Sequence, residues 1–264
     1  MNYTDKIVWI TGASSGIGEA LTHSFAKRNA TIIISGRRMA ELERVKQQCN
    51  SAAEKIHIVT FDVSNTNEIN QAANQVIEKF GKIDILINNA GVSQRALVKD
   101  APIEIDRKIM EINFFGTVAL TKAILPFMIS QQAGKIIVIS SLAGKLGTKY
   151  RSAYAASKHA LHGFFDSLRC EVWQDNIQVL LVCPGYIKTN ISFNAITADG
   201  SPQNKMDEGQ ANGMLPEVLS EKIIKAMENG KEEVAFGGSE LIGLKLKRFF
   251  PGMLSNILKK RKSA

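Results

Sequence analysis

A tyrosine and a lysine four residues apart are the clearest chemical signal in this sequence. Tyr154 and Lys158 would share one face of a helix, and Ser141 lies thirteen residues upstream of the tyrosine. An ammonium group beside a phenol favours the phenolate and lowers a pKa that starts near ~10. A tyrosine in that setting can donate or accept a proton near neutral pH. Because the same spacing occurs on ordinary amphipathic helices, the pair needs support from elsewhere in the chain.

A glycine-rich segment at residues 11–18 supplies that support. It lies between an apolar run at residues 7–10, which predicts a buried strand, and residues 19–28, which predict a helix. Glycines at positions 12, 16 and 18 permit a tight turn whose backbone N–H groups approach a pyrophosphate, next to the positive end of a helix dipole. The alternative is a Gly/Ser-rich surface turn, which the strand–loop–helix context disfavours.

The elements that must position these residues alternate along the chain. Apolar runs predict strands at residues 7–10, 31–35, 56–61, 83–87, 135–140 and 177–182, with a weaker seventh at 234–236. Helical patterns lie between them, near 16–28, 39–49, 66–80, 103–130, 152–174 and 216–229. This alternation predicts a parallel sheet covered on both faces. We therefore expect one α/β domain: a Rossmann-like, doubly wound, seven-stranded parallel sheet in three α/β/α layers.

Two segments fall outside the alternation. One lies within the predicted catalytic domain, residues 1–244, and the other follows it. Residues 188–215 are polar and follow the carboxyl end of the sixth strand, where open α/β sheets bind ligands, so we expect a helical or loop lid. Residues 245–264 contain seven basic and no acidic residues, interleaved with aromatic and aliphatic ones. They predict a basic amphipathic tail for an anionic membrane surface. The alternative is a solvated tail that packs on the body or on a second subunit.

The composition argues against a nucleic-acid-binding protein and against a metal site. The net charge is +8, most of it in the tail, and no nucleic-acid-binding motif accompanies it. The three cysteines and four histidines have no metal-ligand spacing, so we expect no metal site. An odd number of cysteines fits a reducing compartment, which suggests a cytoplasmic protein, peripheral to a membrane if the tail binds one. We expect no signal peptide and no apolar stretch of the ~18 residues that a membrane span needs.

Together with residues 88–91, these motifs resemble the classical short-chain dehydrogenase/reductases over about residues 5–240. Residues 151–159, 184–190 and 194–201 resemble more narrowly the 11β-hydroxysteroid dehydrogenase-like branch, closest to its dehydrogenase/reductase 7B type. The resemblance implies an oxidoreductase that transfers hydride between a nicotinamide and a ketone or secondary alcohol. It also implies a homodimer or homotetramer that associates through the two helices near 103–130 and 152–174.

The resemblance assigns four residues to catalysis. Tyr154 would exchange a proton with the substrate oxygen, and Lys158 would lower the pKa of the tyrosine and bind the nicotinamide ribose. Ser141 would hydrogen-bond the carbonyl oxygen as negative charge develops. Asn113 matches the asparagine that holds a water chain leading to the lysine. Tyr186 would join Ser141 and Tyr154 around the substrate.

The cofactor is expected to be NADP(H). NAD-specific sites commonly place a carboxylate after the second strand, whereas this chain has Gly36 followed by Arg37 and Arg38, which suit a 2′-phosphate. Asp62 matches an adenine-binding aspartate; alternatively it is a helix N-cap. The expected cofactor contacts are Gly12, Ser14, Ser15, Gly16, Ile17, Gly18, Gly36, Arg37, Arg38, Asp62, Val63, Asn89, Ala90, Gly91, Tyr154, Lys158, Pro184, Gly185, Ile187 and Thr189.

Three functions are compatible with these motifs. Branch resemblance favours reduction of a lipophilic carbonyl, either an acyl- or alkyl-dihydroxyacetone phosphate or a steroid-like ketone. A 3-oxoacyl-thioester reductase would use the same catalytic set. A catalytically silent NADPH-binding regulator is the third possibility, which the intact set of four residues disfavours.

Overall fold

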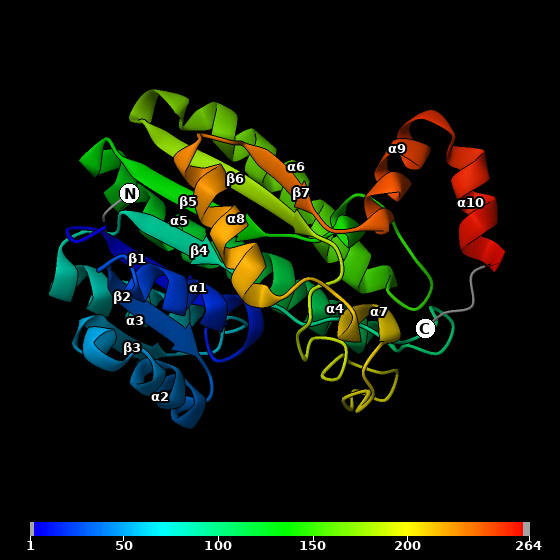
Figure 1. Ribbon diagram of the computed structural model, residues 1–264, viewed down its shortest axis with the longest axis horizontal. Helices are drawn as coiled ribbons and strands as arrows, with labels where there is room; N and C mark the ends of the chain where they lie inside the picture. Colours follow the sequence, from blue (N-terminus) through cyan, green and yellow to red (C-terminus); the bar gives the residue numbers. More distant parts are fainter. Residues whose placement is uncertain (1–2, 261–264) are drawn as a thin grey trace.

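Seven parallel strands form the centre of the computed structural model, which describes residues 3–260 (Figure 1). The strands are β1 (Ile7–Thr11), β2 (Thr31–Gly36), β3 (Ile56–Thr60), β4 (Ile85–Asn88), β5 (Gly134–Ile139), β6 (Ile177–Pro184) and β7 (Glu233–Phe236). Their order in the sheet is β3-β2-β1-β4-β5-β6-β7. The predicted fold class is confirmed, including the weak seventh strand, which pairs with β6.

The strand order changes direction between β1 and β4. β1 pairs with β2 on one side, Ile10 opposite Ile34, and with β4 on the other, Ile10 opposite Ile87. After β3 the chain must cross back over the sheet to reach β4, which leaves a crevice beyond the carboxyl ends of β1 and β4. Open α/β sheets bind dinucleotides at such a switch point.

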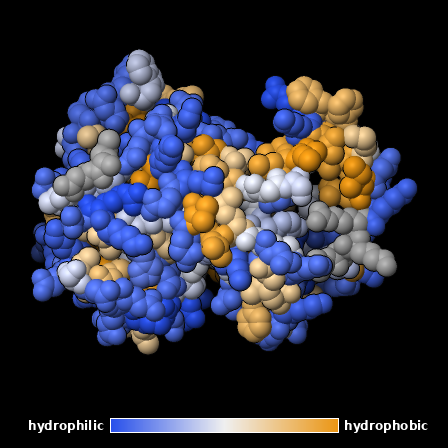
Figure 2. Space-filling view, in the orientation of Figure 1, coloured by the Kyte–Doolittle hydropathy of each residue, from blue (hydrophilic) through white to orange (hydrophobic). Residues whose placement is uncertain are grey.

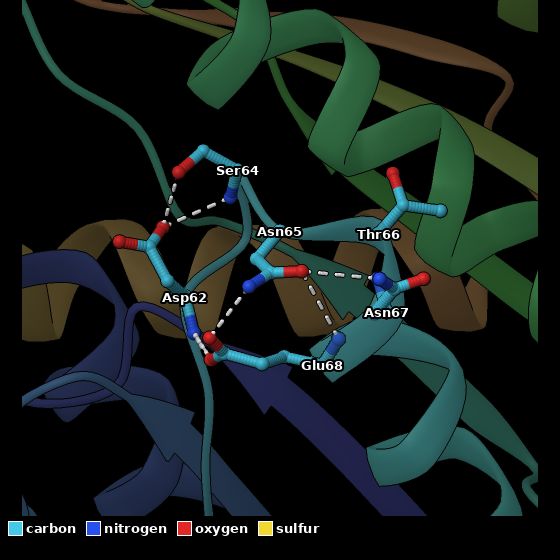
Figure 3. A pocket seen from close by; sticks show the side chains of 6 residues that line it. All are labelled: Asp62, Ser64, Asn65, Thr66, Asn67 and Glu68. Carbon is cyan, nitrogen blue, oxygen red and sulfur yellow. Dashed lines mark hydrogen bonds between the residues drawn. The ribbon is translucent and has the colours of Figure 1, made fainter.

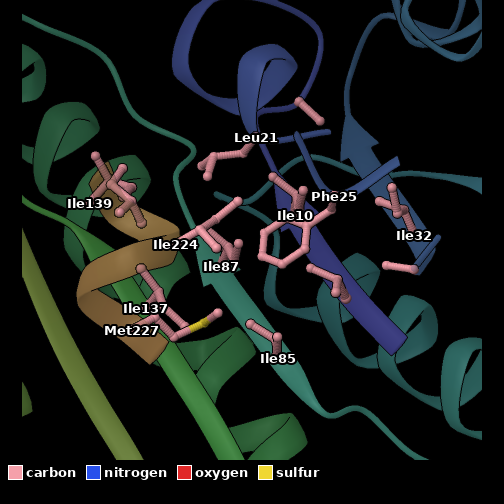
Figure 4. Packing of buried hydrophobic residues seen from close by; sticks show 14 of the residues in the cluster. Ile10, Leu21, Phe25, Ile32, Ile85, Ile87, Ile137, Ile139, Ile224 and Met227 are labelled. Atoms are coloured by element: carbon pink, nitrogen blue, oxygen red, sulfur yellow. The ribbon is translucent and has the colours of Figure 1, made fainter. Parts of the chain in front are cut away.

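Helices cover both faces of the sheet. On one face, α1 (Gly16–Ala26), α2 (Met39–Gln48) and α8 (Pro216–Glu228) pack on a core that includes Phe25 and Met227 (Figure 4). On the other face, α3 (Thr66–Phe80), α5 (Gly116–Gln131) and α6 (Ser152–Glu171) enclose a second core around Trp9 and Phe165. Both faces of each inner strand are therefore buried, which explains why the strand sequences are almost continuously apolar.

The longest helical stretch, Ile103–Gln131, passes from α4 (Ile103–Met110) through a π-helical turn (Glu111–Phe115) into α5. By length and composition it is apolar enough to cross a membrane, so the expectation that the chain has no such stretch is wrong. Leu120, Ile124 and Met128 of this stretch are buried in the second core. Its apolar side chains thus have a packing role in this fold.

The predicted lid and tail lie at the same end of the molecule (Figure 1). Residues 188–215 are mostly irregular, with one short helix, α7 (Glu208–Ala211). The described part of the tail is helical, in α9 (Ile242–Phe249) and α10 (Pro251–Lys260), and residues 261–264 lie outside the described range. Lys149 Nζ donates to the Lys259 carbonyl at 2.8 Å, so α10 contacts the loop before α6. Short 3₁₀ turns occupy Asn50–Lys55, Leu142–Gly144, Trp173–Asp175 and Ser239–Leu241.

Candidate active site

Tyr154 and Ser141 approach each other from different elements. Tyr154 lies in the first turn of α6, where its side chain is buried, and Ser141 is the second residue after β5. Ser141 caps the 3₁₀ turn Leu142–Gly144, because its Oγ accepts the Ala143 N–H at 3.1 Å. Burial raises the pKa of Tyr154 above its ordinary value, and the neighbouring Ser141 hydroxyl only partly offsets that rise. The two hydroxyls can therefore act on the same substrate oxygen.

Lys158 lies one turn further along α6. Its side chain is buried, and its Nζ donates a hydrogen bond to the Ile139 carbonyl at 2.8 Å. Burial lowers the pKa of Lys158 to about 8, because the ammonium loses its hydration. A lysine with a pKa this close to neutral can take up and release a proton under physiological conditions.

Asn113 is held in the π-helical turn between α4 and α5. Its Oδ1 accepts the Val92 N–H at 2.8 Å, and its Nδ2 donates to the Val92 carbonyl at 2.9 Å and to Ser157 Oγ at 3.0 Å. A Cβ at Gly91 would lie 3.0 Å from Asn113 Oδ1 and 3.5 Å from Lys158 Nζ. Asn113 and Lys158 thus flank Gly91, and π-helical turns often mark functional positions of this kind.

The glycine-rich loop has the geometry of a phosphate cradle. Gly12 and Gly16 have φ of +64° and +61°, which side-chain-bearing residues rarely adopt. A Cβ at Gly18 would lie 2.4 Å from the Gly12 carbonyl oxygen, so the path excludes a larger residue. Asn89 Nδ2 donates to the carbonyls of Thr11 and Gly12 at 2.9 and 3.1 Å, and it thereby holds the loop. A Cβ at Gly16 would lie 3.0 Å from Thr189 Cγ2, so the segment after β6 closes over the loop.

Cationic side chains gather at the end of β2. Arg38 Nη2 donates to Ser14 Oγ at 3.3 Å, and Arg37 forms an ion pair with Asp62 at 3.6 Å. Arg44, which the sequence did not single out, donates to the Ser14 carbonyl at 3.2 Å. Nothing in the motif spacing indicates that contact, because α2 reaches the loop only through the tertiary fold.

Asp62 belongs to a polar pocket at the start of α3 (Figure 3). Its Oδ1 accepts the Ser64 N–H and hydroxyl at 2.9 and 2.7 Å. The N-cap of α3 is Asn65, which accepts the N–H groups of Asn67 and Glu68. The alternative interpretation of Asp62 as the helix cap is therefore wrong, and its carboxylate stays beside Arg37. The pocket is lined by Asp62, Ser64, Asn65, Thr66, Asn67 and Glu68.

The turn after β6 is organised by a residue that the sequence did not indicate. A Cβ at Gly185 would lie 2.1 Å from Glu240 Oε1, and that oxygen accepts the Tyr186 N–H at 3.0 Å. The group that packs closely against the Gly185 backbone is therefore the Glu240 carboxylate. Ile187 is buried, and its carbonyl accepts Gln210 Nε2 at 2.7 Å, which ties the turn to the lid.

His162 is buried in α6, one helical turn beyond Lys158. Its Nε2 is 3.0 Å from Ser140 Oγ, and its Nδ1 is 3.4 Å from Glu233 Oε2. Ser140 in turn donates to the Lys158 carbonyl at 3.2 Å. His162 therefore supports the backbone of α6 through Ser140.

Comparison with known proteins agrees with this geometry. Residues 6–199 match the family described as short chain dehydrogenase. The chain belongs to the short-chain dehydrogenase/reductase family. It is 42% identical over 240 residues to dehydrogenase/reductase SDR family member 7B of Xenopus tropicalis, covering 89% of this chain and 78% of that protein. The resemblance to the 7B type is therefore confirmed.

Solved structures of short-chain dehydrogenases share the fold. One from Burkholderia phymatum in complex with NAD superposes with a TM-score of 0.83 at 21% identity, covering 100% of this chain and 98% of that one. The closed form of a serine dehydrogenase complexed with NADP⁺ gives a TM-score of 0.77 at 26% identity, covering 88% and 94%. Since NAD and NADP⁺ complexes share this fold, the fold is common to enzymes of both cofactors.

Proposed function

We propose that this short-chain dehydrogenase/reductase is an NADP(H)-dependent enzyme that interconverts a ketone and a secondary alcohol of a lipophilic substrate. The observation that carries the proposal is the buried Tyr154 phenol beside the Ser141 hydroxyl, with Lys158 one turn away on the same helix. The glycine cradle and the arginines after β2 fit a dinucleotide with a 2′-phosphate.

Each of these residues has a defined task in reduction. NADPH, when bound, supplies the hydride. Ser141 and Tyr154 hydrogen-bond the carbonyl oxygen, and they stabilise the negative charge that develops there. Tyr154 then donates its phenolic proton to that oxygen. Lys158, with a pKa of about 8, restores the proton to the site, and oxidation runs the same steps in reverse.

The apolar surroundings support a lipophilic substrate. Ile196 of the lid packs in a small core with Ile109 of α4 and Ala153 of α6, next to Tyr154. Phe193 in the lid and Leu215 at its end remain exposed. We infer an acyl- or alkyl-dihydroxyacetone phosphate or a steroid-like ketone, because each carries a large apolar part. A 3-oxoacyl thioester is the second candidate.

NADPH oxidation against a carbonyl panel tests this proposal. The panel contains an acyl-dihydroxyacetone phosphate, a steroid ketone, a 3-oxoacyl thioester and a small aromatic aldehyde, with NADH as the control cofactor. We expect turnover with NADPH and the highest kcat/KM on the acyl-dihydroxyacetone phosphate or the steroid ketone. Preference for the thioester would select the second candidate. NADPH binding without turnover on any carbonyl would favour a silent regulator.

We also propose a peripheral membrane role for the tail, in a protein of the cytoplasm. Five apolar side chains of α9, α10 and the residue between them are exposed, and Figure 2 shows a hydrophobic patch beside hydrophilic residues there. No acidic residue occurs in residues 245–264. This pairing suits an anionic lipid surface, which attracts the cations and accepts the apolar groups. The five are Ile242, Phe249, Phe250, Met253 and Ile257.

Deletion of residues 245–264 should reduce binding to anionic vesicles about tenfold or more, because both the charge and the apolar groups are lost. Co-sedimentation with phosphatidylserine-containing vesicles measures this, and neutral vesicles serve as the comparison. Phe249→Ser with Phe250→Ser should weaken binding as well. Trp173→Ser, an equally exposed aromatic outside the tail, should have no effect. Unchanged binding of the deletion variant would show that the tail has another role.

A homodimer or homotetramer through α5 and α6 completes the proposal. Phe114 stacks edge-on with Phe115 and Phe164, at centroid distances of 5.1 and 6.1 Å, and Phe115 is 52% exposed. Such an aromatic cluster on two adjacent helices suits a self-complementary interface. Sedimentation of the purified protein as a monomer would contradict it.

A further inference from the structure

A buried cluster of three charges joins the lid to the segment that begins the catalytic helix. Asp207, directly before α7, accepts a hydrogen bond from Arg95 Nε at 3.1 Å and a second from Arg95 Nη2. Arg151, directly before α6, donates to the same carboxylate oxygen at 2.9 Å. The side chains of Asp207, Arg95 and Arg151 are only 2%, 10% and 19% exposed. Two largely buried cations thus share one buried anion.

The same region of the lid is also attached through its backbone. The Arg95 N–H donates to the Ile196 carbonyl at 2.8 Å, and the Ile196 N–H donates to the Ser93 carbonyl at 2.9 Å. Asp207 itself is held by Gln203 Nε2 at 3.1 Å on its other oxygen. These bonds fix the charge cluster in place.

The cluster is attached to the first turn of α6, which carries Tyr154. Gln94 Oε1 accepts the N–H groups of Ala153 and Tyr154 at 2.9 and 3.3 Å, so the loop that carries Arg95 also caps α6. The charges of Arg151 and Arg95 both lower the pKa of Tyr154, against the raising effect of burial. Lys158 instead donates to the Ile139 carbonyl.

Asp106 and Ser141 also bear on the surroundings of Tyr154. Asp106 of α4 accepts a hydrogen bond from Gln94 Nε2 at 3.3 Å. Ser141 contributes a hydrogen bond from the β5 side. Asp207 offsets one of the two guanidinium charges, which leaves a net charge of +1 in the cluster at the start of α6.

We propose that Arg95 and Arg151 are positioning residues whose net charge favours the phenolate of Tyr154, and that Asp207 adjusts this charge and ties it to the lid. This inference rests on the proposed role of Tyr154 as the proton donor. The phenolate that remains after proton transfer is stabilised by the guanidinium that Asp207 leaves uncompensated. Because Asp207 belongs to the segment 188–215, the packing of that segment on Arg95 and Arg151 determines how much of the guanidinium charge is compensated.

Charge-balance variants test the inference. Arg95→Gln lowers the net charge of the cluster to zero, Asp207→Asn raises it to +2, and the double variant restores +1. We expect the pKa of Tyr154 to rise by about one pH unit in Arg95→Gln, to fall by a similar amount in Asp207→Asn, and to return near the wild-type value in the double variant. Arg28→Gln, which breaks an ion pair with Glu221 elsewhere, is the control and should cause no shift.

Two readouts separate this inference from the proposed function. The alkaline limb of the kcat/KM profile reports the titration during turnover. The ultraviolet absorption of tyrosinate, measured as the difference from the corresponding Tyr154→Phe protein, reports it without any substrate. Ordered shifts in tyrosinate absorption without turnover would support the inference and contradict the enzyme assignment. Shifts of the same direction in Arg95→Gln and Asp207→Asn, no shift in either, or a double variant that does not return towards wild type would overturn it.

Discussion

Tyr154→Phe should lower kcat for carbonyl reduction by about 10²–10⁴-fold and leave the Kd for NADPH within about twofold of wild type. The phenyl ring keeps the volume of a side chain that is 8% exposed, so the packing of α6 is retained. What is lost is the hydroxyl that hydrogen-bonds with Ser141 and donates the proton. Single-turnover absorbance of NADPH measures the chemical step, and fluorescence titration measures binding.

A matched variant makes this result specific. Tyr150→Phe removes the phenol of a residue four positions upstream. The hydrogen bond between Tyr150 and Ala96 uses the Tyr150 backbone carbonyl, which the substitution leaves in place. We therefore expect near wild-type turnover from this variant. If Tyr154→Phe instead kept full activity, another group would supply the proton, and the assignment of Tyr154 would be lost. A parallel loss of NADPH binding would indicate a role for the hydroxyl in forming the site, not in proton transfer.

Replacing Arg37 and Arg38 together by glutamine should weaken NADPH binding about 10–100-fold and NADH binding less than about threefold. The 2′-phosphate distinguishes the two cofactors, and a guanidinium can form two charge-assisted hydrogen bonds to it. Arg38 should contribute more than Arg37, because Arg37 already pairs with Asp62 at 3.6 Å. Isothermal titration with each cofactor measures both constants.

Gly36→Asp offers the reciprocal test. A Cβ at Gly36 has no heavy atom nearer than 3.8 Å, so the carboxylate fits, and its charge should repel a 2′-phosphate while accepting a hydrogen bond from a 2′-hydroxyl. We expect the ratio of NADPH to NADH affinity to fall at least tenfold in this variant. Equal losses for both cofactors in the arginine variants would remove the arginines from recognition of the phosphate.

Local pattern was enough to predict the sheet and the glycine loop. The apolar runs are continuous because both faces of the inner strands are buried, and each run became a strand within about two residues of the expected bounds. The glycines at 12 and 16 were interpretable because positive φ is a property of the backbone at one position. Ser141, Tyr154 and Lys158 follow from spacing, since a serine after a strand and two residues one helical turn apart keep their relation in this fold.

Contacts between segments that are distant in the sequence could not be predicted from local sequence pattern. The helical spacing placed Lys158 near Tyr154, but it did not indicate Arg95 or Asp207, which are 59 and 53 residues from the tyrosine in the chain. The approach of Glu240 to Gly185 and the contact of Arg44 with the Ser14 carbonyl are of the same kind. Sequence periodicity describes which face of an element is buried, whereas the charges around a buried phenol depend on how loops from separate strands and the lid meet. Burial in a low-dielectric interior raises the pKa of the tyrosine and the neighbouring charges oppose that rise, so its protonation chemistry belongs to the tertiary structure.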